Sequence, residues 1–189
     1  MRPFDFIILL FSFAYTLALT HLLSAITRMI RHRRSLVVSW PHAIWMLDAL
    51  IFLAANWISL WDFHEQTVIS IGAIAIGFAF VVVQYLICAL VTPDFEGSDA
   101  FNLRTFHERQ RKTYIGAFLV CMLLSLALNS GGGAIGIQNW ANENALVWAM
   151  VPPTAIPLFV KNNYVEIAAP LLLLVLGVTY TMIYYPALR

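Results

Sequence analysis

The stretch TVISIGAIAIGFAFVVVQYLICALV, residues 67–91, runs for 25 residues without an acidic or basic side chain. An α-helix rises about 1.5 Å per residue, so about 20 apolar residues cross a hydrocarbon core about 30 Å thick. The apolar residues form one continuous run and do not alternate with the period of two that a membrane β-barrel requires. The stretch therefore predicts a transmembrane α-helix.

Five further apolar runs occur in the 189-residue chain. In chain order, the predicted spans are 4–27, 41–61, 67–91, 114–128, 145–160 and 165–185. The composition agrees, because 61% of the residues are hydrophobic and only 11% are charged, against about 25% charged in an average soluble domain. The sequence predicts an all-α fold, a polytopic transmembrane helical bundle of six spans that forms one integral membrane domain over residues 1–189.

The run 145–160 differs from the others because it contains Pro152, Pro153 and Pro157. Each proline removes a backbone N–H donor and clashes with the preceding helical turn. Two forms stay open for this run: a kinked span, or a re-entrant segment that returns to the side it entered. The bundle then has six spans, or five plus a proline-broken re-entrant segment.

Arginine and lysine are concentrated in two predicted loops. The segments 28–34 and 104–112 each carry four of them, whereas the loops 62–66 and 129–144 carry none. By the positive-inside rule the two basic loops face the cytoplasm, and we expect a protein of the bacterial cytoplasmic (inner) membrane. The net charge is only +1, which gives no reason to expect a nucleic-acid partner; the expected surroundings are the lipid bilayer.

Three polar side chains are predicted to lie at one depth inside the bundle. Aspartate near the centre of a membrane helix costs about 2.5–3.5 kcal/mol and usually faces a partner. His21, Asp48 and Gln84 lie six or seven residues from the basic-loop ends of the first three spans, which helical rise converts to about 10 Å. We expect these three to form one buried cluster. Candidate further members are Thr20, Ser24, Asn56, Cys121 and Glu166.

Three roles stay open for this cluster. Interhelical hydrogen bonds, at about 0.6–2 kcal/mol each, would make it structural. A proton or ion relay is the second role, because histidine titrates near neutral pH and can share a proton with aspartate. The third role is a ligand or cofactor pocket, although the five histidines are poorly spaced for ligation of a haem by two of them.

Motifs of several enzyme classes are missing from the sequence. It contains no GxSxG, HExxH or CxxC motif and no Walker loop. Cys88 and Cys121 both fall in predicted spans, where they are expected to pack as small hydrophobic residues rather than form a disulfide or bind a metal. We therefore expect no catalytic residue, no metal and no cofactor, and an enzyme is the least favoured class.

The functional prediction is a small transport or permeation protein with a buried polar cluster. Six spans enclose little volume, so we expect a homo-oligomer or a complex with a partner membrane protein. The alternative is a non-enzymatic accessory or scaffolding subunit of a larger membrane complex, in which the polar cluster only stabilises the fold.

Overall fold

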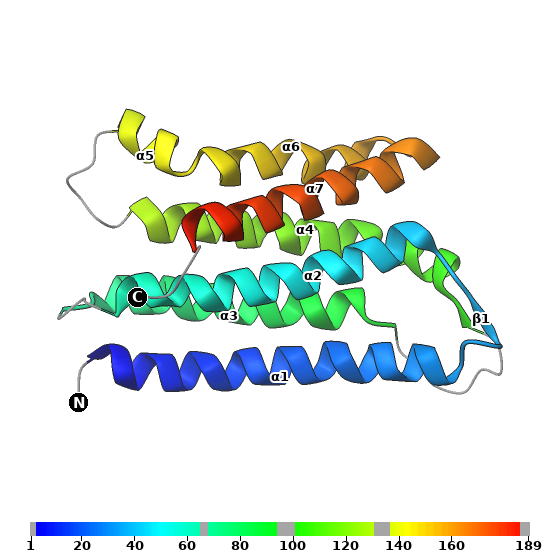
Figure 1. Ribbon diagram of the computed structural model, residues 1–189, viewed down its shortest axis with the longest axis horizontal. Coiled ribbons are helices and arrows are strands. Elements are labelled where there is room, and N and C mark those ends of the chain that lie inside the picture. Colours follow the sequence, from blue (N-terminus) through cyan, green and yellow to red (C-terminus); the bar gives the residue numbers. More distant parts are fainter. Residues whose placement is uncertain (1–2, 65–67, 94–100, 131–136, 186–189) are drawn as a thin grey trace.

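In a computed structural model, the chain is described over residues 3–64, 68–93, 101–130 and 137–185. These residues form helices that lie side by side along one axis (Figure 1). The α-helices are α1 (Pro3–Arg31), α2 (Trp40–Ser59), α3 (Ile71–Val91), α4 (Leu103–Ser130), α5 (Ile137–Glu143), α6 (Ala145–Phe159) and α7 (Asn163–Tyr184). A 3-10 helix, η1 (Leu60–Phe63), continues α2. The prediction of an all-α protein is confirmed.

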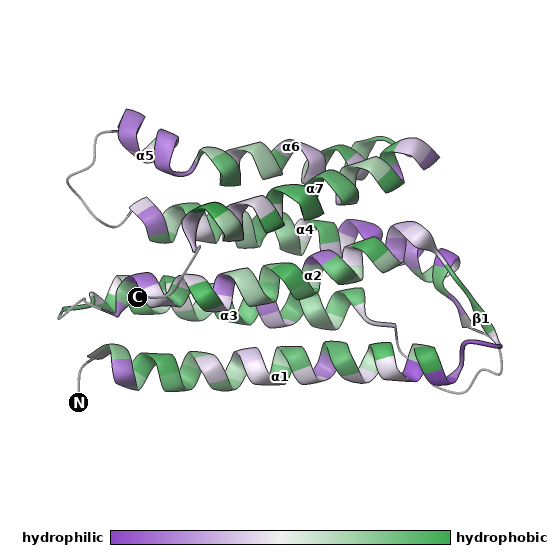
Figure 2. Cartoon of the chain, in the orientation of Figure 1, coloured by the Kyte–Doolittle hydropathy of each residue, from purple (hydrophilic) through white to green (hydrophobic). Residues whose placement is uncertain are grey.

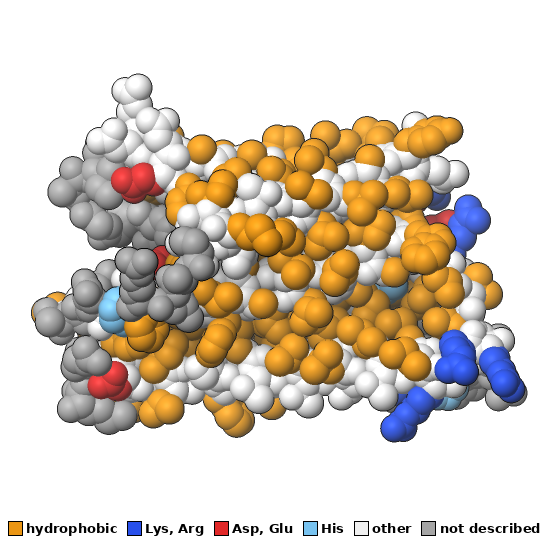
Figure 3. All heavy atoms as spheres, viewed as in Figure 1, with side chains coloured by type: hydrophobic (Ala, Val, Ile, Leu, Met, Phe, Trp, Pro, Cys, Tyr) orange, Lys and Arg blue, Asp and Glu red, His pale blue; other side chains and the backbone are white. Residues whose placement is uncertain are grey.

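Five of these helices, α1 to α4 and α7, are long and apolar enough to cross a membrane. Hydrophobic residues extend along most of these helices, except in the first turns of α4, whereas the short helix α5 is mainly hydrophilic (Figure 2). In the space-filling view, hydrophobic side chains cover the middle of the visible face (Figure 3). These features support the prediction of an integral membrane protein.

The helix bounds follow the predicted spans closely, with one exception. Helix α3 ends at Val91, as predicted, but α4 begins at Leu103, eleven residues before the predicted start at 114. The side chain of Asn102 explains the early start, because its Oδ1 accepts hydrogen bonds from the backbone N–H groups of Arg104 and Thr105. Such a cap satisfies donors that have no partner inside the helix.

Helix α6 is continuous through Pro152, Pro153 and Pro157. It packs against α4 and α7, and it ends at the end of the bundle where α7 begins (Figure 1). The prolines therefore do not break the helix, and a short span and a re-entrant segment both stay open for it. The 15 residues of α6 are fewer than in any of the five long helices, so the number of membrane crossings stays a prediction.

The two ends of the bundle carry opposite charges. Helix α1 has Asp5 in its first turn and Arg28 and Arg31 in its last turn. We call these the acidic end and the basic end; Asp62 and Glu143 also lie at the acidic end, and the lysines and arginines visible in Figure 3 gather at the basic end. At the basic end the two-residue strand β1 (Leu36–Val37) pairs in parallel with β2 (Phe101–Asn102), a contact that the sequence did not predict.

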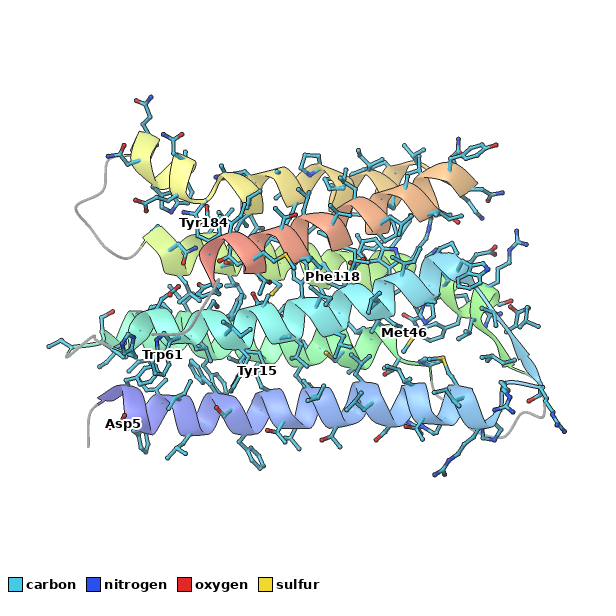
Figure 4. All side chains as sticks on the ribbon, viewed as in Figure 1. Asp5, Tyr15, Met46, Trp61, Phe118 and Tyr184 are labelled. Carbon is cyan, nitrogen blue, oxygen red and sulfur yellow. The ribbon has the colours of Figure 1, made fainter. Side chains whose placement is uncertain are left out.

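Aromatic rings of α2 and α4 form much of the buried core. The Phe118 ring lies 5.2 Å from that of Trp45 and 5.3 Å from that of Phe52, between centroids. Figure 4 labels Phe118 in the middle of the bundle. At the edge of the bundle, Gly77 of α3 leaves room for the Phe11 ring of α1, because a Cβ there would stand 3.1 Å from it. Small residues permit such close approach between membrane helices.

Candidate functional site

Gln84 holds together a polar group in the middle of the bundle, which we call the middle group. Its Oε1 accepts a hydrogen bond from Nδ2 of Asn56 at 2.7 Å and one from Sγ of Cys121 at 3.4 Å. Gln84 and Cys121 are buried, and Asn56 is partly buried. The three side chains come from α3, α2 and α4, so two predicted further members, Asn56 and Cys121, do join Gln84.

His21 takes part in a different contact. Its Nε2 lies 2.7 Å from Oγ1 of Thr92. The Thr92 hydroxyl already donates its hydrogen to the carbonyl of Ala89, so it accepts from His21. The hydrogen bonds of the described residues do not connect His21 with Asp48 or Gln84, and the three residues do not form one hydrogen-bonded network.

Thr20 and Ser24, predicted as further members, are exposed on α1 and lie outside the interior. The reason is the rotation of the helix. Leu22 and Ala25 are fully buried and define the face of α1 that packs on the bundle, and the two hydroxyl residues fall on other faces. Depth along a helix axis therefore did not determine which side chains face inward.

Asp48 is fully buried on α2, and neither of its carboxyl oxygens has a hydrogen-bond partner among the described residues. Taking an ion out of water costs several kcal/mol even after the protein relaxes. Most buried polar groups recover part of that cost through hydrogen bonds. Asp48 recovers none of it from the described residues.

A second group of polar residues fills the basic end. Nη1 of Arg111 lies 2.8 Å from Oε1 of Glu166, and Nε2 of His107 lies 4.0 Å from the other carboxylate oxygen. The Tyr114 hydroxyl is hydrogen-bonded to Nδ1 of His107 at 2.5 Å. We call these four residues the basic-end group. Glu166 was predicted as a member of the His21, Asp48 and Gln84 cluster, but its partners are these residues instead.

The predicted spans place His107 and Arg111 in a polar loop and Tyr114 at the start of the span 114–128, so they do not predict a polar cluster of these three residues. Residues 107, 111 and 114 lie on one face of a helix, since they are spaced by four and three residues. That spacing, together with Asn102 as a cap, would have predicted an extended α4 with an inward polar face.

His42 lies fully buried beside this group. Its ring centroid is 6.1 Å from that of His107 and 5.1 Å from that of Phe106. The backbone of Val91 approaches the ring, but within the described residues neither ring nitrogen makes a hydrogen bond of normal geometry. His42 therefore adds an imidazole without a hydrogen bond of normal geometry beside the basic-end group, in which Nε2 of His107 also lacks a hydrogen-bond partner among the described residues.

A polar cleft opens at the acidic end; we call it the acidic-end cleft. Its volume is about 340 Å³, and its lining includes Asp62, Glu143 and Tyr184. Figure 4 shows Tyr184 toward this end of the bundle, on α7. A smaller cavity of about 30 Å³ lies next to the cleft and reaches Asn56 and Cys121 of the middle group. Phe80, Ser125 and Tyr180 line both spaces.

The described residues contain no group of three or more His, Cys, Asp or Glu side chains that could hold a metal ion. No protein-family model, curated protein or solved structure matches the chain.

Proposed function

We propose that the chain is a small transport protein of the bacterial cytoplasmic membrane, and that Asp48 binds and releases a proton during transport. The observation that carries the proposal is the complete burial of a carboxyl group that has no partner among the described residues. A leucine or an asparagine at this position would avoid the cost of burying an ionisable group. A role in which the proton must leave and return gives a reason for an aspartate.

The position of Asp48 between the other polar sites supports the proposal. Asp48 lies eight residues before Asn56 and six residues after His42 on α2, or about 12 Å and 9 Å along the helix axis. The small cavity beside Asn56, about 30 Å³, can hold a water molecule, which needs roughly 10–15 Å³. Polar groups thus occur from the acidic-end cleft to the basic end.

We also propose that α6 completes six crossings and that the basic end faces the cytoplasm. Helix α6 covers about 22 Å at 1.5 Å per residue, which is shorter than the hydrocarbon core. Its contacts with α4 and α7 support a short span held between longer ones. The positive-inside rule sets the orientation.

The proposal is tested by proton flux into proteoliposomes that contain a pH-sensitive dye. An imposed pH gradient should drive flux through the unmodified protein, and Asp48→Asn should abolish it, since an amide cannot carry the proton. Asp5→Asn is the matched control, because it removes a carboxylate from α1 at the acidic end, and it should retain the flux. Equal flux in Asp48→Asn and the unmodified protein would contradict the proposal.

A specific rival role is the accessory or scaffolding subunit of a larger membrane complex. In that case the purified chain gives no flux above empty vesicles and co-purifies stably with another membrane protein. That combination of results would replace the transport proposal.

A further inference from the structure

We propose that the acidic-end cleft binds a small organic ammonium cation, which is the solute that the protein transports. The inference rests on the proposed function, because it names the substrate class of the same bundle. It is argued from the size of the cleft, the charges in its wall and the arrangement of its aromatic rings.

The size of the cleft suits a small molecule. Its volume of about 340 Å³ lies at the lower end of the range of about 300–1,000 Å³ that is typical of ligand pockets. The cleft lies at the acidic end, between η1, α4, the α5–α6 junction and α7. A solute in it would adjoin the smaller cavity beside Asn56, where the proposed path through the bundle begins.

The charges in the wall favour a cation. Asp62 and Glu143 both line the cleft, and the described residues around it include no lysine or arginine. The Tyr185 hydroxyl donates a hydrogen bond to Oδ2 of Asp62. Burial raises the pKa of Tyr185 above its usual value, and the hydrogen bond to Asp62 raises it further. The phenol is therefore the donor in this contact, and the Asp62 carboxyl oxygen is the acceptor.

Three tyrosine rings favour an organic cation over a bare metal ion. The Tyr180 ring lies 4.9 Å from that of Tyr184 and 6.1 Å from that of Tyr185, at interplanar angles of 40° and 58°. All three residues line the cleft. Rings inclined to one another can present more than one face to an alkylammonium group, which binds to aromatic faces within about 6 Å of the centroid. The carboxylates by themselves would suit a metal ion equally well, so it is the tyrosine rings that favour an organic cation.

The rim of the cleft is fixed by hydrogen bonds between helices. The Tyr184 hydroxyl donates to the backbone carbonyl of Glu143 at 2.9 Å, which connects α7 with α5. Nδ2 of Asn129 donates to Oδ1 of Asn144 at 2.7 Å, which connects α4 with the start of α6. The site is thus largely preformed, and binding does not have to pay the entropy of assembling it.

Calorimetric titration of the full chain in detergent with choline tests the inference. Choline should bind, and its uncharged isostere 3,3-dimethylbutan-1-ol should bind at least about tenfold more weakly, the ratio that corresponds to about 1.4 kcal/mol of charge recognition. Asp62→Asn and Glu143→Gln should each weaken choline binding several-fold, and the double variant should weaken it most. Asp5→Asn, at the same end but outside the cleft, should bind choline like the unmodified protein.

Three results would overturn the inference: no binding of choline, equal binding of the uncharged isostere, or unchanged choline binding in an Asp62→Asn/Glu143→Gln variant whose melting temperature is normal. If that double variant is unfolded, Tyr180→Leu is the test variant in its place. Tyr180→Leu should weaken the binding of choline several-fold without weakening the binding of the uncharged isostere. Choline binding without proton flux would leave the cleft as a cation site and contradict the proposed function. Proton flux without choline binding would support the proposed function and contradict the cation site in the cleft.

Discussion

Glu166 and Asp48 are both carboxylic acids on helices of the bundle, and their surroundings differ. Glu166 has Arg111 at 2.8 Å and His107 at 4.0 Å, and its side chain keeps 13% of its surface exposed. Asp48 is fully buried and has no hydrogen-bond partner among the described residues. The ion pair with Arg111 stabilises the fold, and this explains why a glutamate occupies position 166. Contacts with the described residues do not explain Asp48 through stability, and we propose a functional role for it instead.

Removing the partner of Glu166 should produce the largest loss of stability. Arg111→Met leaves a mostly buried carboxylate without its cation, which costs about 3–5 kcal/mol in such pairs. The free energy of unfolding, measured by titration with a denaturing detergent, should fall by that amount. Adding Glu166→Gln to Arg111→Met should restore most of it, because no unpaired charge remains. Full stability of the Arg111→Met variant would show that the pair is not structural.

A pair of tyrosines gives a second, smaller contrast. The Tyr114 hydroxyl is bonded to His107, whereas the buried Tyr15 hydroxyl has no hydrogen-bond partner among the described residues. Tyr114→Phe should lower the free energy of unfolding by about 1–2 kcal/mol, since it leaves a buried ring nitrogen unsatisfied. Tyr15→Phe should leave it unchanged or raise it. Equal losses of unfolding free energy in the two variants, measured in the same detergent, would contradict the claim that the two hydroxyls differ in their hydrogen bonding.

The middle group should show an effect of about 1 kcal/mol. Gln84→Leu removes the acceptor for Asn56 and Cys121, and hydrogen bonds between membrane helices are worth about 0.6 kcal/mol on average. Gln84→Met also lacks the amide acceptor but keeps a similar side-chain length, and it should show a similar loss. A loss above about 3 kcal/mol in Gln84→Leu would mean that the middle group, and not the basic-end group, holds the bundle together.

Asp48 should show the smallest effect on stability, and with the opposite sign. Asp48→Leu should leave the free energy of unfolding unchanged or raise it by about 1 kcal/mol, because replacing an unpartnered polar group by a hydrophobic one removes its burial cost. The same thermal or detergent unfolding assay measures it. A loss as large as that of Arg111→Met would show that Asp48 has a structural partner and would end the comparison with Glu166.

The fold could be predicted from the sequence further than the site could. Continuous apolar runs determine membrane helices almost alone, so most helix bounds fell within a few residues of their predicted positions. Helical rise placed His21, Asp48 and Gln84 at one depth, but it carries no information about rotation around the helix axis. Rotation and side-chain reach decide contacts, and they turned His21 toward Thr92 and Gln84 toward Asn56.

The basic-end group could not be predicted from the sequence for a related reason. Polar residues between two apolar runs were assigned to a loop, because arginine and histidine are rarely buried without partners. Here Arg111 is buried with Glu166 from the distant helix α7. A partner 55 residues away in the chain cannot be identified from local composition.

Infrared difference spectroscopy of the carboxyl group tests most directly whether Asp48 exchanges a proton with water. The purified protein in lipid should show a C=O stretching band of a protonated carboxylic acid that is absent in Asp48→Asn and present in Asp5→Asn. If water reaches Asp48, this band should shift to lower frequency in deuterated buffer within the time of the flux assay. A band that keeps its frequency in deuterated buffer, or that persists in Asp48→Asn, would contradict the proposal that Asp48 carries the transported proton.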